Sequence, residues 1–369
     1  MTARLISIAS AFPDHQADVA MATRHAQMCS CESDEQATKV AKLYRRTGVR
    51  SRGSVLIEAV VDGLAVQSFY PSLQSEEPLG PTMKERNERF AQEAPRLACQ
   101  AASRALENGG VDPSQITHVV TVTCTGFTAP GLDIALIQEL GLPATTQRVA
   151  VGFMGCHGLI NGLRAARGLV AAEPQARVLV ASVELCSLHY QYGYDTQRIV
   201  SGSLFADGAA GLVITGDDSA AETDPIGGVT ATGSCLIPDS TEAMTWRIGD
   251  HGFLMTLEAS VPGYIERHLK SYLVDWLAQY GHTISSIGGW AVHPGGIRIL
   301  QAVETALDLP EDALDISRDV LRDHGNMSSA TLGAVLGRFL QHEVPKPWLM
   351  LGFGPGLEIE VALIEATDA

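Results

Sequence analysis

The sequence has little positive charge. It contains 26 Lys and Arg residues against 42 Asp and Glu residues, which gives a formal net charge of -16. Proteins that bind nucleic acids usually carry a basic excess, so this composition argues against such a partner. Charged residues make up 18% of the chain and apolar residues 46%, which is typical of a compact enzyme rather than a disordered chain.

Long apolar runs are also missing. No stretch approaches the roughly 20 apolar residues that a membrane-spanning helix needs. The first residues, MTARLISIASAFPDHQ, reach Pro13 and Asp14 without the apolar segment of a signal peptide. We therefore expect a cytoplasmic protein with no membrane partner. The 369 residues suffice for two core-bearing units or one large duplicated unit.

Paired cysteine motifs are absent as well. The seven cysteines are odd in number and scattered, and they include a CSC triplet but no CxxC pair. This pattern argues against a disulfide framework and against a zinc site. We expect reduced thiols and no bound metal.

Strand and helix patterns alternate along the whole chain, which predicts a layered α/β fold. Helices are predicted over residues 34–47, 81–108, 131–140, 159–172 and 261–281, and a loop leading into a helix over 321–340. Strands are predicted over 116–124, 145–153, 177–185, 208–215, the start of 286–296, and both sides of a glycine turn in 348–365. The polar stretch 216–225 is the best candidate boundary, and it divides residues 1–220 from 221–369.

The segment VGFMGCHGLI (151–160) places Cys156 where a strand gives way to a helix. A thiol there faces unpaired N–H groups and the positive end of the helix dipole, which lowers the thiol pKa and favours the nucleophilic thiolate. Gly152, Gly155 and Gly158 permit a tight turn and the close approach of a substrate. A buried structural cysteine in a glycine-rich bend would explain this segment equally well.

Two other polar residues lie at similar junctions. His293, in AVHPGG, follows a buried strand at the place where an α/β protein forms a cleft, although it could also cap the next helix. Asn326, in HGNMSSAT, could be a helix N-cap or an amide that donates to a developing oxyanion. Together with Cys156, these residues can form a set of nucleophile, base partner and oxyanion donor.

The order of the motifs GFMGCHG, LFADGAA, HPGG, GNMSSAT and GFGPG closely resembles the type III polyketide synthases, the chalcone synthase-like family. The similarity extends from about residue 35 to residue 365. It implies a thiolase fold, in which two similar α/β halves form a five-layer αβαβα sandwich, usually within a homodimer. The N-terminal half, 1–220, would carry the nucleophilic cysteine, and the C-terminal half, 221–369, the histidine and the asparagine.

The resemblance also implies a reaction. Cys156 would carry the acyl starter and the growing chain, and His293 would hold it as a thiolate. His293 and Asn326 would bind the thioester carbonyl of malonyl-CoA, which becomes an enolate when carbon dioxide leaves. No metal or redox cofactor is implied, because decarboxylation itself generates the carbanion. The acyltransferase would release a pyrone, a resorcinol or another phenolic polyketide.

Basic residues are needed to bind the phosphates of CoA. Lys39, Lys42 and Arg46 share one side of a predicted helix and match the CoA-binding residues of the family. An ordinary solvated helix face has the same pattern. Arg298, after HPGG, would lie near the mouth of the CoA tunnel.

The resemblance assigns several positions to the cavity. Phe205 matches the gatekeeper phenylalanine between the CoA tunnel and the cavity. The other cavity positions are Cys124, Thr125, Cys186, His189, Trp246 and Met255. Met255 stands where plant members often carry a second phenylalanine, and His189 and Trp246 replace smaller residues. We expect this bulk to disfavour a planar coumaroyl starter and to favour malonyl, acetyl or a flexible acyl chain.

Two other interpretations remain open. A β-ketoacyl-ACP synthase III-like enzyme fed by acyl carrier protein would more typically show an HQAN-like histidine motif. It would also need a docking patch for an acidic partner, which this acidic chain does not obviously offer. A catalytically silent thiolase-fold protein that binds acyl chains would be expected to lose the nucleophile, so the presence of Cys156, His293 and Asn326 favours the enzyme.

Overall fold

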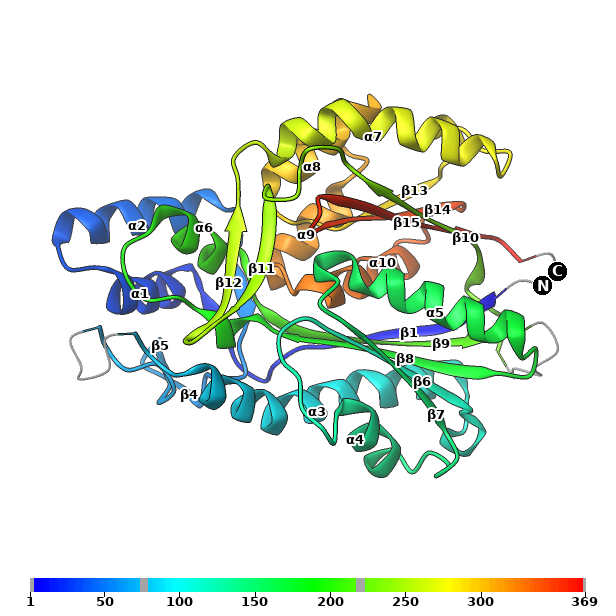
Figure 1. Cartoon of the computed structure of the whole chain (residues 1–369), viewed down its shortest axis with the longest axis horizontal. Coiled ribbons are helices and arrows are strands. Elements are labelled where there is room, and N and C mark those ends of the chain that lie inside the picture. Colours follow the sequence, from blue (N-terminus) through cyan, green and yellow to red (C-terminus); the bar gives the residue numbers. More distant parts are fainter. Residues whose placement is uncertain (1–2, 74–78, 217–222, 368–369) are drawn as a thin grey trace.

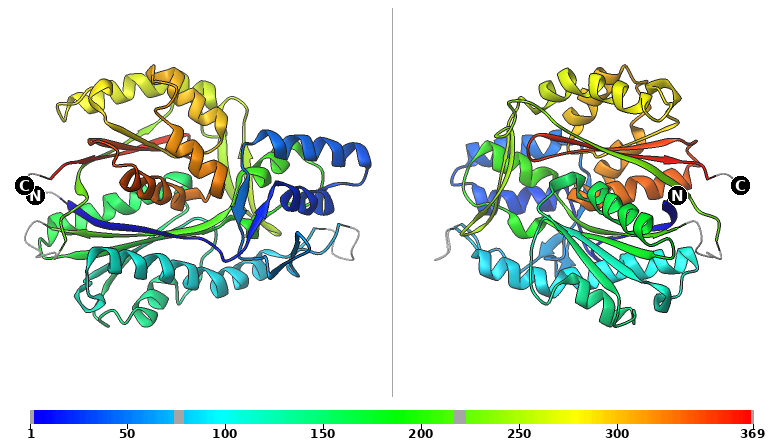
Figure 2. Two further views of the ribbon diagram at one scale, coloured as in Figure 1. Left: turned by 180° about the vertical axis from the view of Figure 1, so that it is seen from behind. Right: turned by 45° about the vertical axis from the view of Figure 1, so that its right-hand side comes forward.

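The computed structural model describes residues 3–73, 79–216 and 223–367. Within these residues, nine strands form one hydrogen-bonded sheet in the order β13-β14-β15-β10-β1-β9-β8-β6-β7. The short pairing of β1 with β10, from Ala3 with Val229 to Leu5 with Gly227, joins two leaves of this sheet. Figures 1 and 2 show that the leaves lie face to face with helices between them.

The first leaf contains β1, β9, β8, β6 and β7, and the second contains β13, β14, β15 and β10. The strands of the first leaf span Ala3–Ala11, Asp207–Thr215, Arg177–Leu185, His118–Thr123 and Gln147–Gly152, in that order. Those of the second span Gly289–Val292, Trp348–Gly354, Glu358–Glu365 and Gly227–Leu236. Strands such as β8 and β14 are almost continuously apolar, because helices cover both of their faces.

Two helices, α5 (Gly158–Ala172) and α10 (Thr331–Gln341), fill the middle layer (Figure 1). Small residues let them approach the strands closely. A Cβ atom on Gly162 would lie 2.7 Å from a Val122 methyl carbon, and one on Gly333 would lie 2.3 Å from the Cβ of Ala210. Leu159, Leu212 and Met350 belong to the core between the leaves.

Helices also cover the outer faces. In Figure 1, α3 (Met83–Gly109) and α4 (Leu132–Glu139) lie against the first leaf. On the opposite side α7 (Val261–Ala278) and α8 (Ile297–Leu307) lie against the second leaf. The molecule is therefore a five-layer αβαβα sandwich, which confirms the predicted fold class.

A smaller group of elements lies at the end of the sandwich away from the chain termini (Figure 2). It contains α1 (Val19–Ser30), α2 (Asp34–Arg46) and α6 (Thr196–Leu204). It also contains three two-stranded antiparallel sheets, which pair β2 (Gln16–Asp18) with β3 (Ser51–Gly53), β4 (Ala59–Val61) with β5 (Leu64–Val66), and β11 (Met244–Gly249) with β12 (Gly252–Leu257). The last two pairs are hairpins. These elements build the cavity described below.

Most predicted elements have the expected type, but one differs. Residues 321–324 end helix α9 (Asp315–His324) and are not a loop. The predicted boundary between residues 220 and 221 lies outside the described residues. All seven cysteines are free thiols, as predicted. No described helix combines the length and apolar character needed to cross a bilayer.

Candidate active site

Cys156 lies in a short 3-10 turn, Gly155–His157, between the end of β7 and the start of α5. The turn requires unusual backbone angles, since φ is +58° at Phe153 and +77° at Gly155. A Cβ atom on Gly155 would lie 2.5 Å from the Cδ of Pro355, in the GFGPG turn. Position 155 therefore requires glycine for two reasons: the backbone has a positive φ, and Pro355 of the second leaf packs against it too closely for a Cβ atom.

The thiol of Cys156 is enclosed by polar and charged groups. Burial raises the pKa of this thiol to about 12, and the Glu184 carboxylate acts in the same direction, whereas the Ser328 and Asn326 side chains oppose the shift. The expectation of a lowered thiol pKa is therefore wrong. It considered the helix terminus but not the burial of the thiol and the nearby carboxylate. Formation of the thiolate requires a group that takes the proton.

Asn326 lies between α9 and the short turn η5 (Ser328–Ala330), next to the thiol. Its Oδ1 accepts a hydrogen bond from the Ser328 N–H at 2.8 Å, which leaves the Nδ2 group as a donor. Helix α10 begins only at Thr331, so Asn326 is not its N-cap. The backbone N–H of Asn326 donates to Leu204 O at 2.8 Å, and Asn326 O accepts from the Ala206 N–H at 2.9 Å. These bonds fix Asn326 to the segment that carries Phe205.

His293 directly follows β13, and its backbone N–H donates to Leu351 O at 2.7 Å. The side chain is 2% exposed, and neither ring nitrogen has a hydrogen-bond partner. Burial, with a smaller contribution from His157, lowers the pKa of His293 to about 3. The ring neither caps α8, whose N-cap is Gly296, nor forms a hydrogen bond with Cys156. A buried imidazole without partners is available to bind a ligand.

A buried carboxylate organises the other side of the thiol. Glu184, near the end of β8, accepts hydrogen bonds from the Cys124 N–H at 3.0 Å and the Thr125 hydroxyl at 2.8 Å, and also from the Ser329 hydroxyl. The Cys124 thiol lies 3.2 Å from the Ser328 hydroxyl. Burial raises the pKa of Glu184 above its ordinary value, while these hydrogen bonds lower it. The network connects the ends of β6 and β8 to η5.

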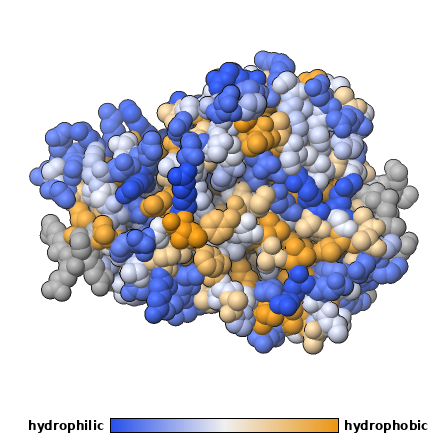
Figure 3. All heavy atoms as spheres, in the orientation of Figure 1, coloured by the Kyte–Doolittle hydropathy of each residue, from blue (hydrophilic) through white to orange (hydrophobic). Residues whose placement is uncertain are grey.

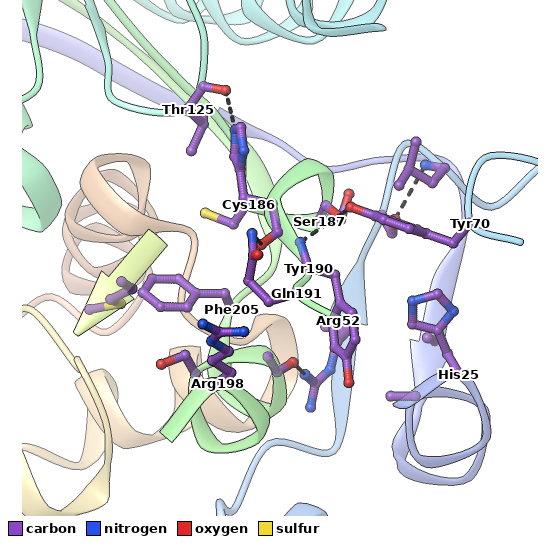
Figure 4. Close-up of a pocket in the computed structure, with 18 of the residues that line it drawn as sticks. His25, Arg52, Tyr70, Thr125, Cys186, Ser187, Tyr190, Gln191, Arg198 and Phe205 are labelled. Carbon is purple, nitrogen blue, oxygen red and sulfur yellow. Dashed lines mark hydrogen bonds between the residues drawn. The ribbon is translucent and has the colours of Figure 1, made fainter. Parts of the chain in front are cut away.

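A cavity of about 430 Å³ opens from Cys156, within the range typical of small-molecule sites. All the predicted cavity residues line it, namely Phe205, Cys124, Thr125, Cys186, His189, Trp246 and Met255. Figure 4 shows Phe205 and Cys186 pointing into this cavity, with Arg52 and His25 farther along it.

Three side chains form one wall of the cavity. The rings of His189 and Phe253 stack at 4.2 Å, and Trp246 meets both rings edge-on. His189 Nε2 donates to Thr125 O at 2.6 Å, and the Phe253 N–H donates to His189 Nδ1 at 3.1 Å. Trp246 Nε1 donates to Cys124 O at 2.7 Å. These bonds fix the β11–β12 hairpin to the loop after β6.

Sequence models of the chalcone and stilbene synthases match the chain, the N-terminal domain over residues 1–219 and the C-terminal domain over 229–367. The chain belongs to this family. It is a type III polyketide synthase and therefore an acyltransferase.

Known members of the family support this assignment. The 1,3,6,8-tetrahydroxynaphthalene synthase of Streptomyces peucetius subsp. caesius is 37% identical over 271 residues, which are 73% of this chain and 72% of that protein. The alpha-pyrone synthesis polyketide synthase-like Pks18 of Mycobacterium tuberculosis is 34% identical over 289 residues, 77% of this chain and 74% of its own. The crystal structure of PKS-I from the brown alga Ectocarpus siliculosus superposes with a TM-score of 0.91 at 26% identity, covering 99% of this chain and 98% of its own.

In this polyketide synthase the cavity also reaches residues of α1, α6 and β5. This part of the cavity, here called the second arm, is lined by Met21, Met28 and Leu64, among others. Polar side chains, including that of His25, also line the second arm. Burial, together with the nearby charge of Arg52, lowers the pKa of His25 to about 4. This arm offers the synthase a mainly apolar path away from Cys156.

The predicted CoA-binding residues lie outside the cavity lining. Lys39, Lys42 and Arg46 are exposed on α2, where Lys39 forms an ion pair with Glu35 at 2.7 Å. Arg298 is exposed in the first turn of α8. A Cβ atom on Gly48 would lie 2.7 Å from Ile297, so the end of α2 contacts the start of α8. The segments that carry Arg46 and Arg298 are therefore neighbours.

Sequence analysis missed several residues of this synthase site. Glu184 is a lone acid in an apolar strand, and Ser328 and Ser329 directly follow Asn326, so their positions were available as signals. His157, at the N-cap of α5, and Asn161 and Arg164 on that helix are spaced four and three residues apart. Their partners on β15 could not be recognised without the structure.

Proposed function

We propose that this polyketide synthase condenses malonyl-CoA with an acyl-CoA starter, using Cys156, His293 and Asn326. Cys156 attacks the starter thioester, so that an acyl–sulfur bond forms on the enzyme and CoA thiolate leaves. His293 accepts the thiol proton in this step. Two observations carry the proposal: the contact of Cys156 with the Asn326 amide, and the buried His293 imidazole, whose ring nitrogens have no hydrogen-bond partner.

His293 and Asn326 also act in the condensation step, as hydrogen-bond donors. His293 and Asn326 hold the thioester oxygen of malonyl-CoA, and carbon dioxide leaves to form an enolate. The enolate carbon attacks the acyl group on Cys156, a carbon–carbon bond forms, and the Cys156 thiolate is released. One such donor lowers the activation free energy of the condensation by on the order of 3 kcal/mol. No cofactor beyond the CoA thioesters is needed, because loss of carbon dioxide supplies the electron pair.

The shape of the cavity favours a flexible acyl starter. The wall of His189, Trp246 and Phe253 occupies space beside Cys156, whereas the second arm extends toward Met21 and Leu64. A linear chain can bend into this arm, but a rigid planar aromatic acid cannot follow the same path. The product would be a pyrone, a resorcinol or another phenolic compound. One relative is named for a naphthalene product and another for α-pyrone synthesis.

The basic residues near the end of α2 support CoA as the carrier. Lys39, Lys42 and Arg46 form an exposed basic face, and Arg298 lies on the adjoining helix. In this proposal they bind the CoA phosphates, while Phe205 separates the CoA from the cavity. Free thiols and CoA substrates also fit a cytoplasmic enzyme.

The surface supports a homodimer. Strand β7 lies at the edge of the sheet, and the nearby Phe127 and Phe153 are 51% and 41% exposed. Apolar side chains gather across the middle of the face shown in Figure 3. An exposed apolar edge strand commonly pairs with a second chain. Light scattering should give twice the chain mass for the wild type and a smaller mass for Phe127→Asp.

Product formation tests the reaction and the carrier together. Wild-type enzyme and Cys156→Ala receive malonyl-CoA alone, malonyl-CoA with acyl-CoA starters of increasing length, and the same acyl groups on acyl carrier protein. Mass spectrometry should detect polyketides with the wild type only, with linear acyl-CoA starters giving most product. Product from the carrier protein alone would reject acyl-CoA as the donor. Equal product from Cys156→Ala would reject the nucleophile.

A further inference from the structure

His157 directly follows the nucleophile and is 1% exposed. Its Nδ1 lies 2.8 Å from Asn161 Oδ1, and Asn161 Nδ2 donates to Glu360 Oε1 at 3.0 Å. Since the Asn161 amide nitrogen serves the carboxylate, its oxygen must accept from the imidazole. The proton of the neutral ring is therefore on Nδ1, and Nε2 carries the lone pair.

The partners of His157 connect the two halves of the molecule. Glu360 lies on β15, is 1% exposed, and also accepts from Arg164 Nη1 at 3.0 Å and from the Ser234 hydroxyl at 2.8 Å. His157, the N-cap of α5, lies on the same side of the helix as Asn161 and Arg164. Strand β15 pairs with β14, whose Leu351 O accepts the backbone N–H of His293. The network thus links the turn of Cys156 to the leaf that carries His293.

The other side of the imidazole faces charge without a hydrogen bond. Nε2 has no hydrogen-bond partner and lies 3.7 Å from Glu358 Oε2. Glycines provide the space for this ring. A Cβ atom on Gly354 would lie 2.4 Å from Nε2, and one on Gly352 would lie 2.8 Å from the Cβ of His157. In this chain the first two glycines of the GFGPG motif therefore accommodate His157.

We propose that His157 is a positioning residue that holds Cys156 relative to His293. Asn161, which is hydrogen-bonded to Glu360, fixes one side of the His157 ring. The other side of the ring lies against Glu358 and Gly354. The inference rests on the proposed role of Cys156 as nucleophile.

Alkylation of Cys156 by iodoacetamide, followed by peptide mass spectrometry across a pH series, tests this inference without any condensation. At each pH the rate in His157→Phe should differ from that of the wild type, because loss of the hydrogen bond to Asn161 Oδ1 releases the turn that carries Cys156. His157→Asn keeps a donor near the position of Nδ1, so its rate should stay closer to that of the wild type.

Steady-state kinetics tests the positioning role through the separate effects on kcat and KM. His157→Phe fills the space but loses the hydrogen bond, so kcat should fall about 10- to 100-fold while KM for malonyl-CoA changes little. His157→Asn should give a kcat between those of wild type and His157→Phe.

The matched control is His118→Asn. His118 is also 1% exposed, with Nδ1 2.8 Å from the Thr117 hydroxyl and Nε2 3.8 Å from Glu173, but it lies at the start of β6 and not beside Cys156 in the chain. This variant should keep the wild-type alkylation rate and kcat. A wild-type alkylation rate and kcat in His157→Phe would overturn the inference, even if the condensation reaction is confirmed. An equal loss in His118→Asn would also overturn it.

Discussion

The cavity wall and the end of β13 each contain a buried histidine, and the two histidines are used differently. Burial lowers the pKa of both His189 and His293 to about 3. In the wall, His189 uses both ring nitrogens, one as a donor to Thr125 O and one as an acceptor from the Phe253 N–H. At the end of β13, neither ring nitrogen of His293 has a partner.

The hydrogen-bonded histidine therefore fixes the shape of the cavity, whereas the histidine without partners is available for the reaction. A histidine with both nitrogens satisfied is held in one tautomer and one orientation, so it fixes the outline of the cavity. Burial removes water from the imidazole of a histidine without partners, and no protein hydrogen bond offsets the free-energy cost. A substrate oxygen or a thiol proton can supply the missing hydrogen bond. Substitutions in the two regions should therefore have opposite effects on activity and stability.

Replacement of the unpartnered histidine should give the largest effect. His293→Ala loses a donor to the enolate oxygen, so kcat should fall about 100- to 1000-fold. The free energy of unfolding near neutral pH should stay the same or rise, because no protein hydrogen bond is lost. Steady-state kinetics and urea denaturation measure the two quantities. Near-normal turnover in this variant would contradict the assignment of His293.

The pH dependence of stability should show the next largest effect. His293 stays neutral in the folded protein down to about pH 3, whereas an imidazole in the unfolded chain binds a proton below about pH 6.5. The unfolded state thus binds more protons in this range, and stability falls as the pH is lowered. His293→Gln should reduce the slope of unfolding free energy against pH by up to about 1.4 kcal/mol per pH unit.

Chemical denaturation at several pH values gives this slope. The control is His251→Gln, which replaces a histidine of the β11–β12 turn that is only partly buried. An unchanged slope in His293→Gln would show that His293 already binds a proton in the folded state.

Replacement of the wall histidine should act mainly on stability. His189→Leu leaves Thr125 O and the Phe253 N–H without their partner, so the free energy of unfolding should decrease by about 1 to 3 kcal/mol. Turnover of the folded fraction should stay within a few-fold of wild type, because His189 makes no contact with the proposed reacting atoms. Urea denaturation and kinetics on the same sample measure both. A loss of turnover as large as that of His293→Ala would abolish the distinction between the two regions.

Enlargement of the wall should change selectivity by a smaller amount. Trp246→Gly removes an indole that meets His189 and Phe253 and opens space beside Cys156. The ratio of kcat/KM for a planar aromatic starter to that for a linear starter should rise about tenfold. Competition between the two acyl-CoA starters, read by mass spectrometry, measures the ratio. An unchanged preference would show that the wall does not select the starter.

The sequence predicted much of this molecule where local pattern determines structure. The helices over 34–47 and 81–108 and the strands over 177–185 and 208–215 have strong periodicity or long apolar runs, and all four are present. Every residue that the resemblance assigned to the cavity lines it in the structure. The helical end of 315–324 was missed, because its Asp and Arg residues give a weak apolar pattern and Gly325 suggested a loop.

The electrostatics of the site could not be predicted in the same way. The pKa of Cys156 depends on Glu184, which is 28 positions away in sequence and becomes a neighbour only when β7 and β8 are in place. The role of His157 depends on Glu358 and Glu360 from the last strand. Such effects arise from groups that only tertiary packing brings together, so a pattern within one segment contains no signal for them.

The backbone hydrogen bonds of Asn326 have a consequence for the timing of the proposed reaction. Leu204 and Ala206, on either side of Phe205, hold both main-chain groups of Asn326. In the proposed reaction, a displacement of the Phe205 backbone would carry the amide of Asn326 with it and misalign that donor. Passage of a CoA thioester beside a displaced Phe205 and formation of the enolate would then occur at separate times in each cycle.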